Sequence, residues 1–144
     1  MKLAQLTTLL LISVPAPLPA ATGVGDCQPG AVLESYFDAF NAHSVDGIMS
    51  LIHDEFQWIF LTGDQAAVEI SGPEQLRSWL EQYFLSTPGA RSTLEHVISD
   101  GCLASTRERA YWSSGDSEKS QTALASYQIR NGKILRIWYL NDSD

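Results

Sequence analysis

Residues 31–60 read AVLESYFDAFNAHSVDGIMSLIHDEFQWIF, and this stretch predicts two consecutive helices that lead into a strand. From Ala31 to Ala42 the apolar side chains recur at the spacing of one helical face. They are Val32, Leu33, Tyr36, Phe37 and Phe40. A shorter apolar stripe from Val45 to Ile52 predicts a second helix, and Ser44 or Asp46 can cap its N-terminus.

After Glu55 the period of the apolar residues changes from helical to extended. Phe56, Trp58 and Phe60 then share one face of a predicted strand. The following segment, from Thr62 to Ile70, is polar at first and then apolar, which predicts a short edge strand or a loop.

A third helix is expected to begin at Ser71. Ser71 as the N-cap and Glu74 three residues later match a capping box, and Pro73 is tolerated in the first turn. The apolar face of this helix is Leu76, Trp79, Leu80, Tyr83 and Phe84. Pro88-Gly89 stops the helix.

From Ala90 onward no helical period remains, and four strands are predicted. They span Thr93 to Ser99, Cys102 to Trp112, about Gln121 to Ile129, and Ile134 to Leu140. Asp100-Gly101 and Asn131-Gly132 are two-residue hairpin signals, and the polar segment 113–119 predicts a third turn. Three helices packed on one face of a curved antiparallel sheet make a two-layer α+β domain.

The first 23 residues predict a secretory signal peptide, followed by one domain at residues 27–142. Lys2 precedes a mostly apolar segment from Leu3 to Val14, and Pro15 to Gly23 is rich in proline and alanine. Such a segment is too short for a membrane span. A secreted or periplasmic location is therefore expected.

The remaining domain is strongly acidic. Removal of the leader leaves eight basic and 17 acidic residues, a formal charge of −9. Such a surface repels phosphate backbones and anionic lipids, so neither nucleic acid nor a membrane is expected as a partner.

Export places Cys27 and Cys102 where disulfides form and persist. One intramolecular bridge is the simplest interpretation, and it would stabilise the fold by roughly 4 kcal/mol in the chain-entropy model. The alternative is a lipid-modified Cys27, although Gly25-Asp26 lacks the apolar-then-small pattern of lipoprotein cleavage sites.

The order of the elements resembles the NTF2-like superfamily, and within it the SnoaL-like branch that also contains ketosteroid isomerases. The resemblance rests on YFDAFNAHSVDGIMSLIHDEF at 36–56 and NGKILRIWYLND at 131–142. It implies a cone-shaped α+β barrel with an apolar pocket in its wide end, often in homodimers packed through the sheet. Members include isomerases, polyketide cyclases, dehydratases, hydrolases and non-catalytic binding modules, so the fold alone decides little about function.

The ketosteroid isomerase residues carry over only in part. Tyr36 matches the tyrosine that hydrogen-bonds the substrate oxygen. The position of the catalytic base corresponds to Phe60, which cannot move a proton, and that of the second oxyanion donor corresponds to about Ala125. Ketosteroid isomerase chemistry is therefore not expected, and Tyr36 can equally be a core residue.

Glu108 is the candidate acid or base. Regular alternation puts five side chains on one face of their strand: Ala104, Thr106, Glu108, Ala110 and Trp112. The resemblance places this face toward the pocket, where a carboxylate among apolar groups should have a raised pKa. The alternative is a Glu108 that pairs with a basic side chain or reaches solvent.

Several aromatic residues are expected to bind a flat or apolar ligand, or else to form part of the core. They are Trp58, Phe60, Trp79, Tyr83, Trp112 and Tyr127. No histidine pair has metal-site spacing, and no phosphate loop or serine elbow is present, so we expect no metal and no cofactor.

Arginine and aromatic residues on the outer sheet face suit a homodimer interface, although a solvated face is equally compatible with them. They are Arg107, Arg109, Arg136, Tyr111 and Trp138.

Three hypotheses about function follow from the sequence. The first is a binding module for a small apolar or aromatic molecule, the second is an isomerase, cyclase or hydrolase that uses Tyr36 and Glu108, and the third is a non-catalytic, dimeric interaction domain.

Overall fold

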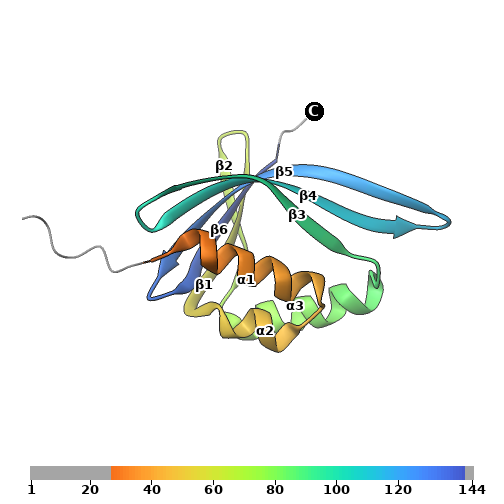
Figure 1. Ribbon diagram of the computed structural model, residues 1–144, viewed down its shortest axis with the longest axis horizontal. Helices are drawn as coiled ribbons and strands as arrows, with labels where there is room; N and C mark the ends of the chain where they lie inside the picture. Colours follow the sequence, from red (N-terminus) through yellow and green to blue (C-terminus); the bar gives the residue numbers. More distant parts are fainter. Residues whose placement is uncertain (1–26, 142–144) are drawn as a thin grey trace, which may run out of the picture.

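Three helices cover one face of a six-stranded sheet in the computed structural model, which describes residues 27–141 (Figure 1). The elements are α1 (Pro29–Asn41), α2 (Val45–Ser50), β1 (Ile52–Thr62), β2 (Gln65–Ser71), α3 (Pro73–Ser86), β3 (Arg91–Asp100), β4 (Leu103–Ser114), β5 (Ser117–Arg130) and β6 (Lys133–Asn141). The expected two-layer α+β architecture is confirmed. The leader expected at 1–23 lies outside the described residues.

The strands are ordered β2-β1-β6-β5-β4-β3. Every neighbouring pair is antiparallel except β1 and β6, which are parallel, so the expectation of a wholly antiparallel sheet is wrong at this one contact. The parallel pair arises because the last strand returns beside the first. Figure 1 shows the three helices together on the same side of the sheet and the β4–β5 hairpin extending beyond them.

The first helix forms where its side chains predict it, whereas the second ends at Ser50 and not at Ile52, because Ile52 already pairs with Ile134 of β6. The buried residues of α1 are Pro29, Val32, Leu33, Tyr36 and Phe37. The chain then turns through His43 at a φ of 52°. Of the two candidate caps for α2, Ser44 is the one used, because its hydroxyl oxygen accepts a hydrogen bond from the Gly47 amide at 3.1 Å.

The predicted capping box of α3 is wrong. Ser71 still belongs to β2, where it pairs with Gln57 of β1, so its backbone is not available as an N-cap. Gly72 takes that position at a φ of 85°, a conformation that glycine adopts without a steric penalty. The Ser71 amide instead donates to Oε1 of Gln75 at 2.7 Å.

Two of the three hairpin turns differ from their predicted positions. Asp100 pairs with Leu103, so the loop between β3 and β4 is Gly101-Cys102, and Cys102 is in the turn and not in the strand. Most of segment 113–119 continues the β4–β5 ladder, with Gly115-Asp116 as the turn. Asn131-Gly132 is confirmed, since both residues have the positive φ values, 52° and 71°, that the turn requires.

A disulfide joins Cys27 to Cys102, with 5.2 Å between their Cα atoms. It ties the residues before α1 to the β3–β4 turn across a sequence separation of 75 residues. The turn is held a second time by the Ile129 amide, which donates to the Cys102 carbonyl at 2.8 Å. Closing a loop of this length restricts the unfolded chain and stabilises the fold by about 4 kcal/mol.

The end of α1 is fastened to the start of β3 by Asn41. Its side-chain amide donates to the Ser92 carbonyl at 2.9 Å, and its oxygen accepts from the Ser92 amide at 2.8 Å. Ser92 is only 7% exposed, so water cannot easily replace either bond. One side chain thus satisfies both backbone groups of a buried strand residue.

We expect Asn41→Ala to lower the free energy of unfolding by about 3 kcal/mol, because it leaves two buried backbone groups without partners. Asn41→Asp keeps the acceptor for the Ser92 amide but turns a carboxylate oxygen toward the Ser92 carbonyl oxygen, so it should also destabilise the protein. Urea denaturation of the three proteins measures both effects. A loss below about 1 kcal/mol for Asn41→Ala would contradict this role.

Candidate functional site

A cavity of about 260 Å³ lies between the helices and the sheet. Eight of its thirteen lining residues are aromatic. The helices contribute Tyr36, Phe37, Phe40, Trp79 and Tyr83, and the sheet contributes Trp58, Phe60 and Tyr139. The polar side chains of the lining are Glu108, Ser92 and Gln121. The cavity is therefore a largely apolar pocket with few polar groups, which is typical of small-molecule sites.

The rings pack on one another at the wall of the pocket. Trp79 and Tyr83 are one helical turn apart on α3, and their rings stack at 4.8 Å with 9° between the planes. Trp58 of β1 meets Trp79 edge-on, also at 4.8 Å. Such contacts hold the rings in fixed orientations and present flat apolar surfaces to the cavity.

Glu108 is the one ionisable carboxyl group of the lining, and it is only 4% exposed. The Tyr127 hydroxyl donates a hydrogen bond to its Oε1, and the Tyr139 hydroxyl donates to its Oε2 at 2.8 Å. The residues paired with Glu108 on the adjacent strands are Leu94 and Ala123. Tyrosines from β5 and β6 thus hold a carboxyl group that projects inward from β4.

Burial raises the pKa of Glu108 to about 7, while the two tyrosine hydrogen bonds act in the opposite direction. Within residues 27–141, none of the ion pairs involves Glu108. Neither alternative considered from the sequence, a basic partner or exposure to solvent, is found around this side chain. Glu108 can consequently gain or lose a proton near neutral pH.

Tyr36 faces the same cavity from α1 and is 5% exposed. Burial, with a smaller contribution from the charge of Glu108, raises its pKa above the usual value of 10. Its hydroxyl therefore stays protonated and acts only as a hydrogen-bonding group. Its ring lies edge-on to that of Tyr127 at 6.3 Å.

The structure gathers most of the predicted site residues around one cavity. Tyr36, Trp58, Phe60, Trp79, Tyr83 and Glu108 all line it. Tyr127 is fully buried behind the lining, where it holds Glu108. Trp112 is not a lining residue: it lies farther out along β4, opposite Lys119 and partly buried.

Tyr139 is the main residue of the site that sequence reasoning missed. It follows Ile137 at the strand period, so alternation along β6 could have indicated its inward direction. Its proximity to Glu108 depends on strand order, since β5 lies between β4 and β6 and pairs Ala125 with Tyr139. Local pattern does not contain that information.

His43, in the turn between α1 and α2, has a structural environment. His43 Nε2 lies 2.7 Å from the Ala90 carbonyl oxygen, and its ring stacks on Phe84 at 4.3 Å. Within residues 27–141, no group of three His, Cys, Asp or Glu side chains could hold a metal ion.

The outer sheet face carries both ion pairs and exposed apolar side chains. Glu95 contacts Arg107 at 3.3 Å and Arg109 at 2.7 Å. Leu124 and Leu140 are paired across β5 and β6, and about half of each side chain is exposed. A homodimer through this face stays a prediction.

Residues 33–137 match the family model described as a SnoaL-like domain. None of the curated proteins compared with the chain matches it. The fold is similar to an uncharacterised cystatin-fold protein from Novosphingobium aromaticivorans, with a TM-score of 0.66 and 20% identity over 77% of this chain and 96% of that one. It is also similar to IdmH from Streptomyces antibioticus, with a TM-score of 0.67 and 19% identity over 80% and 92% of the two chains.

A third similar structure comes from Jannaschia sp. CCS1, with a TM-score of 0.62 and 16% identity over 78% and 83% of the two chains. IdmH and the Jannaschia protein are each described as a proposed polyketide cyclase. At such identities the structures show a shared fold alone. The solved structures share the architecture of this chain, and the family model spans most of its length, so this protein belongs to the SnoaL-like domain family.

Proposed function

We propose that this protein binds a small, largely apolar molecule in the cavity, with Glu108 and Tyr36 contacting the polar group of that molecule. The observation that carries this proposal is a mostly aromatic wall that surrounds a single buried carboxyl group. If the interior served only as a packed core, its side chains would leave no cavity of this size.

The volume limits the size of the ligand. Cavities of about 150 Å³ accept a single benzene ring, and drug-sized ligands occupy roughly 300 Å³ or more. A cavity of about 260 Å³ lies between these values. One or two rings with a short substituent would fit.

Catalysis at the same site is the second candidate function. A carboxyl group with a pKa of about 7 is suited to general acid or base chemistry at neutral pH, and the Tyr36 hydroxyl lines the same cavity as a hydrogen-bond donor. The similarity to two proposed polyketide cyclases supports an enzyme of the cyclase type, alongside the isomerase and hydrolase alternatives. Turnover of a bound compound by the parent, and its loss in Glu108→Gln, separates the two functions, since a binding module converts no ligand.

A compound screen by thermal shift should find ring-containing molecules that stabilise the protein. A ligand at about a hundred times its dissociation constant adds roughly 2.7 kcal/mol to the free energy of unfolding. Trp79→Leu should weaken binding about tenfold because it removes a stacking surface. Leu85→Ala, at an 85% exposed position on the same helix, is the matched control and should bind like the parent. Equal binding by Trp79→Leu would exclude the cavity as the binding site.

Stability should depend on pH through Glu108. Its pKa is about 7 in the folded protein and near 4.5 in the unfolded chain, so its stabilising contribution is complete below about pH 4.5 and is lost as the pH rises through about 7. At about 1.36 kcal/mol per unit, the loss approaches 3 kcal/mol. Urea denaturation between about pH 4.5 and pH 8 should show this decline in the parent and not in Glu108→Gln. Parallel pH profiles for the two proteins would show that Glu108 has an ordinary pKa.

The protein acts outside the cytoplasm in this proposal. The support is the leader-like segment at 1–23 together with the Cys27–Cys102 disulfide, which persists in oxidising compartments. In the described part of the chain, no helix is long and apolar enough to cross a membrane. Mass spectrometry of the exported protein should find an N-terminus between Ala20 and Cys27 and no free thiol. A chain that retains Met1 and two free thiols would refute export.

A further inference from the structure

The pocket is unusual in the sign of its charge. Glu108 is its ionisable carboxyl group, and none of the described lining residues is a lysine, an arginine or a histidine. Buried carboxylates normally have a cationic partner or shift to the neutral form. When Glu108 is ionised, the described lining of the cavity supplies no counter-charge.

The nearest basic residues in the sequence are directed elsewhere. Arg107 and Arg109 flank Glu108 on β4, but alternation along the strand puts them on the outer face, where both pair with Glu95. The acidic partner on β3 thus holds the two arginines away from the interior carboxyl group.

Glu108 also has unused acceptor capacity. Each of its oxygens accepts one tyrosine hydroxyl, whereas an ionised carboxylate offers about four lone-pair sites. The carboxyl group lines the cavity, so a ligand there can contact it.

The aromatic walls suit a cation as well as a flat molecule. The faces of Trp, Tyr and Phe rings carry partial negative charge and attract ammonium groups at about 6 Å or less. Trp58, Trp79 and Tyr83 line the cavity as one packed group, with Phe60 and Tyr139 beside Trp58. The formal charge of the whole chain, −8, further favours the approach of cations.

We propose that the ligand of this cavity carries a protonated or quaternary amine, whose charge pairs with Glu108 while the aromatic rings cover its apolar part. This inference rests on the proposed binding function and names the chemical class of the ligand. An apolar or aromatic amine of one or two rings would fit the volume of the cavity, pack on its aromatic rings and pair its charge with the carboxyl group of Glu108.

Such a ligand would bind in competition with a proton on Glu108. The titratable groups that face Glu108 are Tyr36 from α1, Tyr127 from β5 and Tyr139 from β6, and the adjacent position on β3 is Leu94. The pKa of each tyrosine is raised, chiefly by burial, so all three remain neutral. Affinity for a permanently charged ligand should therefore rise as the pH increases through about 7.

Three probes with the same ring test the inference by isothermal titration calorimetry: benzyltrimethylammonium, benzyl alcohol and benzoate. At about pH 8 the ammonium compound should bind about tenfold or more tightly than the alcohol, and benzoate should not bind. The preference should decrease by about tenfold on going from about pH 8 to about pH 6, because Glu108 gains a proton in that range. None of the three probes changes its own charge there, so the decrease can be assigned to the protein.

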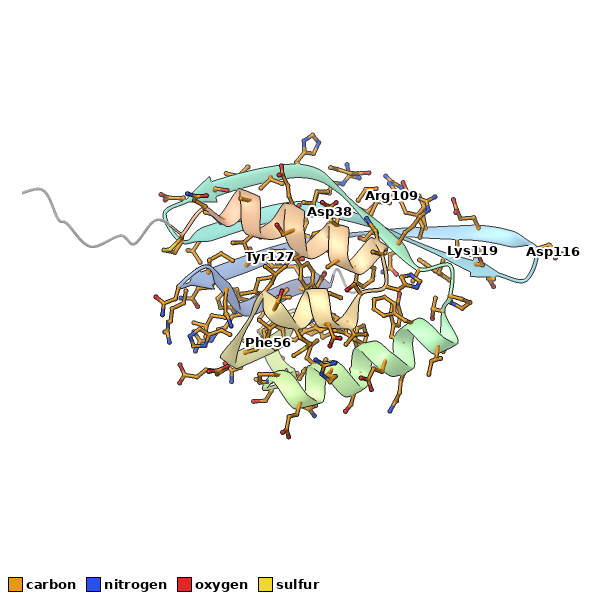
Figure 2. The ribbon with its side chains drawn as sticks, turned by 60° about the horizontal axis from the view of Figure 1, so that its bottom comes forward. Asp38, Phe56, Arg109, Asp116, Lys119 and Tyr127 are labelled. Atoms are coloured by element: carbon orange, nitrogen blue, oxygen red, sulfur yellow. A yellow bond between two sulfur atoms is a disulfide. The ribbon has the colours of Figure 1, made fainter. Side chains whose placement is uncertain are left out.

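Two variants and a control identify the groups responsible. Glu108→Gln should abolish both the preference for the ammonium compound and its pH dependence while still binding benzyl alcohol. Asp116→Asn removes one negative charge at the far tip of the β4–β5 hairpin, which Figure 2 shows well away from Tyr127, and it should behave like the parent. Trp79→Leu keeps Glu108 and should reduce the preference by about threefold, which tests the aromatic contribution separately.

The outcomes separate this inference from the proposed function. If benzyl alcohol or another neutral compound binds as tightly as the ammonium compound, or if Glu108→Gln keeps the preference, the inference is overturned and the binding function stands. If neither these probes nor the wider screen yields any ligand, both fail.

Discussion

The hydroxyl groups of Tyr127 and Tyr139 donate hydrogen bonds to the two oxygens of Glu108, and these contacts join three neighbouring strands inside the fold. A buried carboxyl group without such partners would oppose folding by several kcal/mol. The two tyrosines offset part of that cost without neutralising the group. The site therefore depends on a compromise, in which the carboxyl group is held firmly and its proton affinity remains high.

The cavity exists because the aromatic residues pack against each other along its wall instead of filling it. Trp79 and Tyr83 stack on one another along α3, and Trp58 meets this pair from the sheet. These contacts leave ring faces uncovered toward the cavity. An empty space lined by such groups forgoes dispersion contacts, so it is maintained at some expense of stability, as functional sites often are.

The two faces of the sheet divide the charges of β4. On the outer face Arg107 and Arg109 are paired with Glu95, and on the inner face the hydrogen-bond partners of Glu108 within residues 27–141 are tyrosine hydroxyls. Strand alternation produces this separation directly, because successive side chains point to opposite faces. This alternation puts the carboxyl group of Glu108 inside the fold and the ion pairs of Arg107 and Arg109 with Glu95 on its surface.

The sequence by itself determined the class of fold, since apolar periods are local and each element here is long enough to show one. It favoured the disulfide over a lipid-modified Cys27, because two cysteines allow a single intramolecular pairing. Its candidate site residues included Glu108 and five aromatic residues that line the cavity. Where a local signal competed with strand pairing, pairing prevailed: Ser71 matches a helix cap, yet its ladder contact with Gln57 keeps it in β2.

Only the tertiary structure decided what surrounds Glu108. Alternation puts Glu108 on the opposite face from Arg107 and Arg109, and the family resemblance implied that its face points inward. Strand order, however, determines that Tyr139 reaches it. Trp112 has the same periodicity as Glu108, and its position farther out along β4 excludes it from the lining. Strand order and the extent of each element depend on contacts between residues far apart in the chain, and a local sequence pattern carries no record of them.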